Sequence, residues 1–220
     1  QRSTIVEKSA KFLTLIKKYR LLIAIIITMT AAFSIFVPAF FQISTFMNLI
    51  LQTSTLLIIA LGMTFVIILG SIDLSVGAQV AICGVIGATV VSGYPDNSTM
   101  GAIVGILATL GTGIACGAFN GLMIGIGGVS PFMATLASMT LLRGAALVIC
   151  GDARVSVKNN IYNSLAQIKI GGMLPLVTVL IIILVYMCWV LLNKTTFGRK
   201  TYAVGGNKIA ARIVGINPGI

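Results

Sequence analysis

The stretch Gly70-Ser71-Ile72-Asp73-Leu74-Ser75-Val76-Gly77 decides how this chain folds, because it places a carboxylate and hydroxyl groups between two long apolar runs. From residue 49 to residue 91, Asp73 is the only charged residue. An isolated carboxylate at hydrocarbon depth is costly unless it is paired, protonated or placed at a water-filled break. We therefore interpret the stretch as a break between two membrane-embedded segments.

Two roles are open for the polar side chains of this break. Asp73 or Ser75 can cap the helix that we expect to begin at Val76, because the first N–H groups of a helix have no partner within it. Alternatively, the break belongs to a discontinuous helix beside a transport pathway, where such helix ends are exposed. The two roles are compatible, and a tight cytoplasmic turn between two ordinary spans is a further alternative.

The composition indicates an all-α integral membrane protein, a polytopic helical bundle. Of the 220 residues, 58% are hydrophobic and only 9% are charged, whereas soluble domains have roughly 25% charged residues. In such a protein the net charge of +11 mostly reports where the loops lie. The basic residues do not interleave with aromatic residues, so we expect no nucleic acid partner.

The sequence offers no candidate for catalysis or for metal binding. It has no histidine, and its four cysteines (Cys83, Cys116, Cys150 and Cys188) are far apart, with no Cys-x-x-Cys pair. There is no serine or cysteine nucleophile with a base and no phosphate-binding P-loop. We expect a chain that is not an enzyme and that holds no cofactor of its own.

About six transmembrane helices are expected, because each of six apolar runs approaches the roughly 20 residues needed to cross a bilayer. We place them at residues 21–41, 49–69, 76–91, 100–121, 131–150 and 173–192. The resulting regions are a basic cytoplasmic N-terminus (1–20), a transmembrane domain (21–192) and a cytoplasmic loop (193–220). Both strongly basic ends then lie in the cytoplasm, as the positive-inside rule requires.

Several polar or small residues stand out within these runs. Small residues recur every fourth position from Gly101 to Gly125, which predicts close helix packing, and Asn120 in that row is expected to form an interhelical hydrogen bond. Arg143 is the only cation in a predicted span. We interpret it as a structural charge that snorkels to the interface or pairs with Asp73 or a backbone carbonyl.

Two segments outside the spans have recognisable local patterns. Residues 151–172 carry Ile161, Leu165 and Ile168 at helical spacing, which predicts a short amphipathic helix on the outer surface. In the cytoplasmic loop, we read Gly205-Gly206-Asn207 as a turn with Asn207 as an N-cap. Two helical turns follow and end before Gly215, the usual residue past a helix end. This helix either touches anionic lipid heads or meets a partner protein.

Three groups of motifs, in the same order and spacing, resemble the ribose/galactose/xylose-type permeases of ABC importers. The first is residues 70–77, similar to Gly-Gly-Ile-Asp-Leu-Ser-Val-Gly. The second is Ser130-Pro131-Phe132-Met133-Ala134-Thr135-Leu136 with Leu142-Arg143-Gly144. The third is residues 196–217, with Thr196-Phe197-Gly198-Arg199, Ala203-Val204-Gly205-Gly206-Asn207, Ala210-Ala211-Arg212 and Gly215-Ile216-Asn217.

The resemblance implies a permease subunit in a bacterial inner membrane that passes a monosaccharide inward. Its implied partners are a second permease copy or paralogue, membrane lipids, a periplasmic sugar-binding protein, and a separate ATPase that binds ATP and Mg. It also implies ATPase coupling through Gly205, Gly206, Asn207, Ala210, Ala211, Arg212 and Gly215. For the pathway and helix break we name Asp73, Ser75, Gln52, Gln79 and Asn120.

Two departures from the family pattern and two alternative functions accompany this reading. Lys208 and Ile209 follow the Gly-Gly-Asn motif, where family members often have an acid, and we expect further spans to be missing after residue 220. The main alternative is an ion-coupled secondary carrier with Asp73 as its ion site. A structural or receptor-like membrane protein is the second.

Overall fold

The computed structural model describes residues 2–38, 40–151, 155–165, 168–171 and 174–216. The chain forms two units, residues 1–50 and 51–220. In the first unit, helix α1 (Arg2–Phe36) runs without interruption from the basic segment through the first predicted span. It ends two residues before Pro38, because the residue preceding a proline is disfavoured in helical conformation. The span predicted at residues 21–41 is therefore helical only to Phe36.

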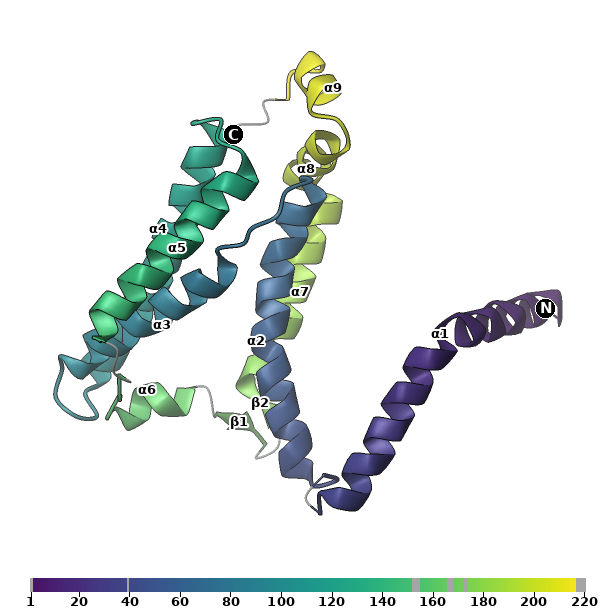
Figure 1. Cartoon of the computed structure of the whole chain (residues 1–220), viewed down its shortest axis with the longest axis horizontal. Coiled ribbons are helices and arrows are strands. Elements are labelled where there is room, and N and C mark those ends of the chain that lie inside the picture. Colours follow the sequence, from purple (N-terminus) through teal and green to yellow (C-terminus); the bar gives the residue numbers. More distant parts are fainter. Residues whose placement is uncertain (1, 39, 152–154, 166–167, 172–173, 217–220) are drawn as a thin grey trace. The chain divides into compact units, whose positions relative to one another are not determined.

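The second unit contains most of α2 and all the later elements (Figure 1). Their bounds are α2 (Ile43–Ile68), α3 (Val76–Ser92), α4 (Thr99–Gly125), α5 (Pro131–Cys150), α6 (Asn160–Ser164), β1 (Lys169–Ile170), β2 (Leu174–Pro175), α7 (Leu176–Lys194), α8 (Thr196–Gly206) and α9 (Lys208–Ile213). Within the residues that the structure describes, five helices are long and apolar enough to cross a membrane, and α3 is a shorter apolar helix of 17 residues. The chain is thus a polytopic helical membrane protein.

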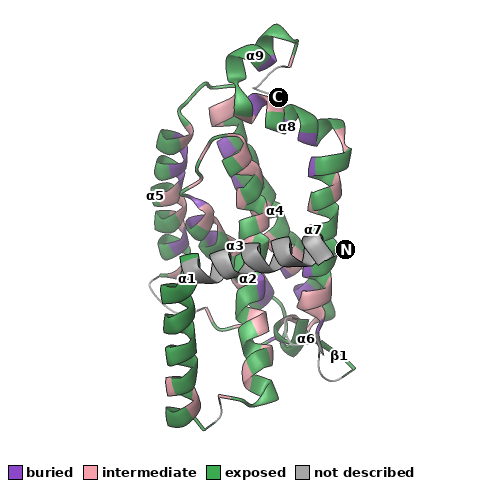
Figure 2. Ribbon diagram, turned by 90° about the vertical axis from the view of Figure 1, so that its right-hand side faces the viewer, coloured by how far each residue is buried: buried purple, intermediate pink, exposed green. Residues whose placement is uncertain are grey.

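The core of the second unit lies where α3 packs against α4 and α5, and these helices carry most of its buried residues (Figure 2). Gly105 of α4 faces Gly87 and Val91 of α3 so closely that a Cβ at Gly105 would overlap the Val91 side chain. The predicted packing role of the small-residue row is confirmed at Gly105. Further along α4, Gly117 and Gly121 have no such neighbour and line a cavity instead.

At one end of this core, the loop before α4 contacts the loop before α6. The Nδ2 atom of Asn159 donates to the Ser98 carbonyl at 2.8 Å, and the backbone N–H of Asn160 donates to Oδ1 of Asn97 at 2.7 Å. The amphipathic helix predicted in residues 151–172 is only partly present. Helix α6 ends at Ser164, and Ile168 lies outside it. A two-stranded antiparallel hairpin follows, because Leu176 N–H pairs back to the Ile168 carbonyl.

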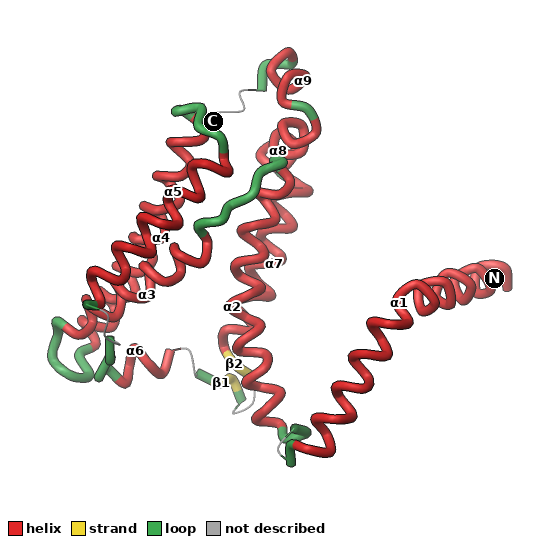
Figure 3. The backbone as a smooth tube through the Cα atoms, viewed as in Figure 1, coloured by secondary structure: helices red, strands yellow, loops and turns green. Residues whose placement is uncertain are grey.

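The break between α2 and α3 is an extended segment rather than a tight turn (Figure 3). Helix α2 is closed by Gly70, whose φ of +72° suits glycine. The N–H of Gly70 donates to Ile67 O at 2.9 Å and that of Ser71 to Val66 O at 3.1 Å, the Schellman pattern. The chain then runs into the core and begins α3 beside Asn120. This residue lies five positions before the end of α4, about 7–8 Å at a rise of 1.5 Å per residue.

Candidate functional site

The polar cluster at the start of α3 is centred on the hydroxyl of Ser75, which is fully buried with 0% exposed surface. The hydroxyl donates to Oδ1 of Asp73 at 2.6 Å. It accepts from Nε2 of Gln79 at 2.7 Å and from Nδ2 of Asn120 at 2.9 Å. A serine hydroxyl has one donor and two acceptor positions, so every hydrogen-bonding position of Ser75 is used.

Asn120 connects this cluster to two neighbouring helices. It lies on α4 and donates to Ser75, 45 residues earlier in the chain, while its Oδ1 accepts from the Ser138 hydroxyl on α5 at 2.5 Å. Both Asn120 and Ser138 are buried. Polar side chains of this kind hold helices together inside a bilayer, where the hydrophobic effect does not. The interhelical hydrogen bond predicted for Asn120 is confirmed.

Asp73 accepts hydrogen bonds at the start of α3. Its Oδ1 accepts from the backbone N–H of Ser75 at 2.8 Å as well as from the Ser75 hydroxyl. It thereby satisfies an N–H at the start of α3. Ser75 occupies the N-cap position, but its side chain makes no cap hydrogen bond. The second carboxylate oxygen, Oδ2, has a longer contact of 3.4 Å with Gln79.

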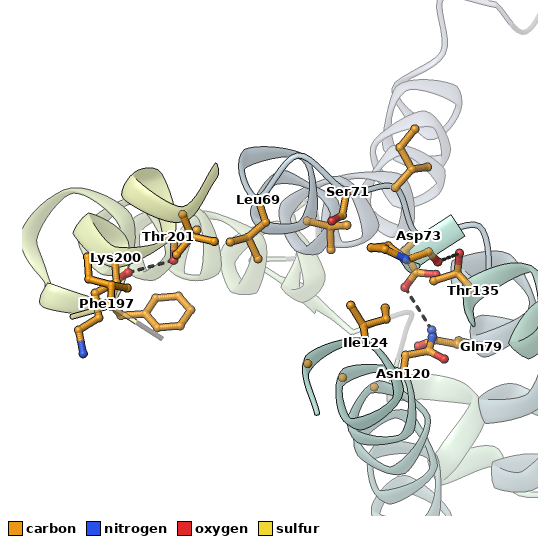
Figure 4. Close-up of a pocket in the computed structure, with 18 of the residues that line it drawn as sticks. Leu69, Ser71, Asp73, Gln79, Asn120, Ile124, Thr135, Phe197, Lys200 and Thr201 are labelled. Carbon is orange, nitrogen blue, oxygen red and sulfur yellow. Dashed lines mark hydrogen bonds between the residues drawn. The ribbon is translucent and has the colours of Figure 1, made fainter. Parts of the chain in front are cut away.

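A cavity of about 690 Å³ lies next to this cluster. Asp73, Gln79 and Asn120 line it on one side, and Figure 4 shows them pointing toward one another. Helix α8 contributes Phe197 and Thr201 to its lining. The walls thus combine apolar side chains with amides, hydroxyls, the Asp73 carboxylate and the Lys200 side chain. A neutral molecule rich in hydroxyl groups can exchange hydrogen bonds with such a lining.

The predicted pathway residues do not all come together. The structure gathers Asp73, Ser75, Gln79 and Asn120 in the cluster. Gln52 is exposed on α2 and lies sixteen residues before its end, away from the cluster. Sequence reasoning missed Ser138, although Thr135 and Ser138 stand one helical turn apart on α5, a spacing that places both on one face.

Arg143 lies on the exposed surface of α5. Among the described side chains, no ion pair within 4.0 Å joins Arg143 to Asp73. The two residues also belong to different parts of the unit: Asp73 contacts Ser75 at the start of α3, whereas Arg143 lies twelve residues into α5. An exposed position on a membrane helix suits a side chain that snorkels to the interface.

The segment predicted to couple to an ATPase forms two helices, α8 and α9, and its local structure differs from the prediction at one point. Gly205 and Gly206 are the last residues of α8 rather than a turn. Asn207 is the N-cap of α9 as predicted, with Oδ1 accepting from the N–H groups of Ile209 and Ala210 at 2.9 and 3.0 Å. The sequence alone gave no reason for α8 to continue through two glycines. Gly205 packs against the end of α2, whereas Gly206 has no atom within 4 Å of an added Cβ.

The end of α9, like its start, is fixed by hydrogen bonds. Gly215 has a φ of +81°. Its N–H donates to Arg212 O at 3.0 Å, and the Ile216 N–H donates to Ala211 O at 2.9 Å, again the Schellman pattern. Of the residues predicted for coupling, Ala211 is buried, whereas Gly206, Asn207, Ala210, Arg212 and Gly215 are exposed.

The outer surface of α9 is apolar and basic. Ile209, Ile213 and the following Val214 are 73%, 81% and 71% exposed. Lys208 and Arg212 lie on the same two turns and are also exposed. Ala211 is the one residue of α9 that the rest of the described structure buries, so these apolar side chains stay uncovered. The surface is therefore suited to contact with another molecule.

Comparison with known proteins places the chain in a transport family. A family model described as the permease component of branched-chain amino acid transport systems matches residues 45–220. The ribose import permease protein RbsC of Escherichia coli strain K12 is 39% identical over 202 residues, which cover 89% of this chain and 58% of the relative. The RbsC protein of Bacillus subtilis strain 168 is 38% identical over 186 residues, covering 83% and 56%.

A galactose relative gives the same picture. The galactose/methyl galactoside import permease protein MglC of Escherichia coli strain K12 is 33% identical over 196 residues, covering 83% of this chain and 58% of the relative. The chain therefore spans a little over half the length of these curated relatives. No solved structure gives a significant match. Because the family model covers most of its length, the chain belongs to the family described as the permease component of branched-chain amino acid transport systems.

Proposed function

We propose that this chain is the membrane permease subunit of an ATP-driven importer that carries a monosaccharide. The observation that carries the proposal is α9, a short helix capped at both ends whose apolar and basic side chains are exposed. The relatives named as ribose and galactose permeases support a sugar as substrate. The hydroxyl and amide groups around the cavity support a neutral, hydroxyl-rich molecule.

The charges at the two ends of the second unit indicate which end faces the cytoplasm. The segment from Lys194 to Arg212 contains five basic residues and no acidic one. On the opposite end, the described residues outside the long helices include one acidic residue, Asp96, and two basic residues, Lys158 and Lys169. Under the positive-inside rule the α8–α9 end faces the cytoplasm. The loops before α4 and α6 then face outward, where a periplasmic sugar-binding protein delivers its cargo.

In this proposal the other subunits of the transporter are separate chains. A separate ATPase binds ATP and Mg and contacts α9 from the cytoplasm. A second permease, identical or a paralogue, completes the pathway in a bacterial inner membrane, surrounded by lipid. The cavity beside Asp73 and Asn120 forms part of the cytoplasmic section of the sugar path. The chain itself performs no chemistry on the sugar.

Purification of the full-length protein from native membranes tests the proposal. The protein is extracted in mild detergent, and the proteins that accompany it are identified by mass spectrometry. We expect an ATPase subunit with P-loop motifs, with or without a periplasmic sugar-binding protein. Repeated isolation without any nucleotide-binding partner would contradict the proposal.

Ile213→Glu is expected to abolish association with the ATPase while membrane insertion is unchanged. The side chain is 81% exposed, so the substitution leaves the permease core intact but puts a charge into an apolar contact. Thr196→Glu is the matched control, since it adds the same charge at an exposed first-turn position of α8, where an acid is favourable. Association is measured by co-purification. Normal association of the Ile213→Glu protein would rule out α9 as the contact.

Asp73→Asn is expected to retain most uptake, whereas Asp73→Ala should lose about tenfold or more. The asparagine side chain keeps an oxygen that accepts from Ser75, and alanine leaves the Ser75 N–H and hydroxyl without that acceptor, at a cost of about 1–3 kcal/mol. Uptake of labelled sugar and protein yield are measured together. Complete loss of uptake in a well-folded Asp73→Asn protein would favour the ion-coupled carrier, in which the charge itself is needed.

A further inference from the structure

Helix α8 rests directly on the last turn of α2. A Cβ at Gly205 would overlap the carbonyl oxygen of Ile68, so the two backbones meet with no side chain between them. Eight residues earlier on α8, the ring of Phe197 lies against that of Phe65, with 6.2 Å between the ring centroids. Because Phe65 and Ile68 lie one helical turn apart, both contacts fall on one end of α2.

The joint between α8 and α9 has no flexible linker. Asn207 is the only residue between the two helices. Its N–H donates to the Ala203 carbonyl of α8 at 3.1 Å, and its side chain accepts from Ile209 and Ala210 of α9. A displacement of α9 is therefore passed to α8 through hydrogen bonds on both sides of one residue.

The last turn of α2 leads directly to the polar cluster. Gly70 ends α2. Three residues later in the chain, Asp73 accepts a hydrogen bond from the Ser75 hydroxyl and so belongs to the polar cluster. From Ser75 the hydrogen bonds continue to Asn120 on α4 and from there to Ser138 on α5. The route from α9 to the core therefore passes through Asn207 to α8, through the backbone contact to α2, and along the chain from α2 to the polar cluster.

We propose that α8 and the last turn of α2 move as one body, and that they carry the motion of α9 to the Asp73–Ser75–Asn120–Ser138 cluster. Gly205 is the positioning residue of this relay, because only glycine permits backbone-to-backbone contact there. Such a contact has no rotatable side chain to absorb a displacement, and packed elements respond by shifting together. The inference rests on the proposed function, since ATP binding elsewhere supplies the motion.

The motion of α9 could also be transmitted through α7 instead of α2, and the experiment must distinguish these two routes. At its other end, α8 packs on α7, where a Cβ at Gly198 would overlap the carbonyl oxygen of Leu192. Transmission through α7 would bypass Ile68 and the polar cluster. It would leave sugar uptake insensitive to a change at Gly205.

Gly205→Leu tests the relay in the full-length chain, assembled with its ATPase and binding protein in proteoliposomes. We expect the ATPase to co-purify as before, because Gly205, although within the predicted coupling segment, faces Ile68 of α2, and the exposed surface of α9 is unchanged. Stimulation of ATP hydrolysis by sugar-loaded binding protein should be lost. Uptake should fall about tenfold or more, the size of a typical coupling between two sites. Gly205→Ala should give a smaller loss in the same direction.

Gly62→Leu is the matched control, since Gly62 lies on α2, is exposed, and has no atom within 4 Å of an added Cβ. Its uptake should equal that of the unsubstituted chain. Uptake of the Gly205→Leu protein at the control level would overturn the relay in favour of α7. Parallel loss of ATPase association and uptake would also overturn it, because the contact would then only hold α9 in place for docking.

A cross-link tests the relay by fixing the contact between α8 and α2, whereas Gly205→Leu disturbs it. In a chain whose four native cysteines are replaced by alanine, Phe65→Cys and Phe197→Cys are joined by a short bifunctional thiol reagent with a reducible spacer. If α8 and α2 move together, the linked protein keeps its uptake. Because Phe197 lines the cavity, the Phe197→Cys chain carrying a monofunctional reagent of the same length is the control for obstruction of the sugar path. A block that appears only in the linked protein and is relieved by reductant would show that the two helices slide past each other and would overturn the relay. An unsubstituted chain without ATP-driven uptake would instead contradict the proposed function.

Discussion

Asn120→Leu is expected to lower the free energy of unfolding by about 1–3 kcal/mol. Leucine fits an apolar helix but provides no hydrogen bond, so the hydroxyls of Ser75 and Ser138 each lose a partner while buried. Hydrogen bonds between membrane helices are worth about 0.6 kcal/mol on average and up to about 1.7 kcal/mol, and this substitution removes two of them. Unfolding in detergent, followed by circular dichroism as denaturing detergent is added, gives the free energy.

Gln52→Leu is the control for this substitution. It removes the same type of amide, but from an exposed position on α2. We expect little change in its free energy of unfolding, as is usual for exposed positions away from structured contacts. Equal effects of the two substitutions would show that the cluster does not stabilise the packing of α3, α4 and α5.

Gly105→Leu is the second substitution with a large expected effect, a loss of about 3 kcal/mol. The added Cβ alone would overlap the Val91 side chain and lie 3.3 Å from the carbonyl oxygen of Gly87. The whole leucine side chain therefore forces α4 away from α3, and overpacking a close contact costs about 1–3 kcal/mol, occasionally more. The midpoint of unfolding and the elution profile in mild detergent both report the change.

Gly111→Leu separates this clash from other effects of losing a glycine. Gly111 lies on the same helix, is exposed, and has nothing within 4 Å of an added Cβ. Both substitutions gain helix propensity, by about 0.8–1 kcal/mol, so that contribution cancels in the comparison. A Gly105→Leu protein as stable as Gly111→Leu would mean that α3 and α4 are not in close contact.

Local patterns predicted those parts of the chain that depend on neighbouring residues alone. The helix starts at Val76 and Pro131 and the N-cap at Asn207 follow from residues within one turn. The end of α9 at Gly215 follows from glycine's freedom at positive φ. The reading of Gly205 as a turn failed, because the contact with Ile68 that favours a helix there comes from residues more than 130 positions away.

The candidate site was predictable residue by residue but not as an assembly. Asp73, Ser75, Gln79 and Asn120 were each conspicuous as polar residues in apolar runs. The hydrogen bonds of the central hydroxyl depend on how α3 packs against α4, which no local pattern contains. For the same reason exposed Gln52 looked equivalent to Gln79. Helix α6 ends before Ile168, whose carbonyl accepts from the N–H of Leu176 eight residues later, a contact that a helical spacing pattern does not contain.

Sugar uptake into proteoliposomes tests the central claim most directly. The full-length protein is reconstituted with its co-purified ATPase, sugar-loaded binding protein is supplied outside, and ATP is enclosed within. Labelled ribose and galactose are the first substrates, because the relatives are named for them. We predict uptake that requires ATP hydrolysis and continues when a protonophore collapses the ion gradient. Uptake that proceeds without ATP and stops with the protonophore would contradict the account and identify an ion-coupled carrier.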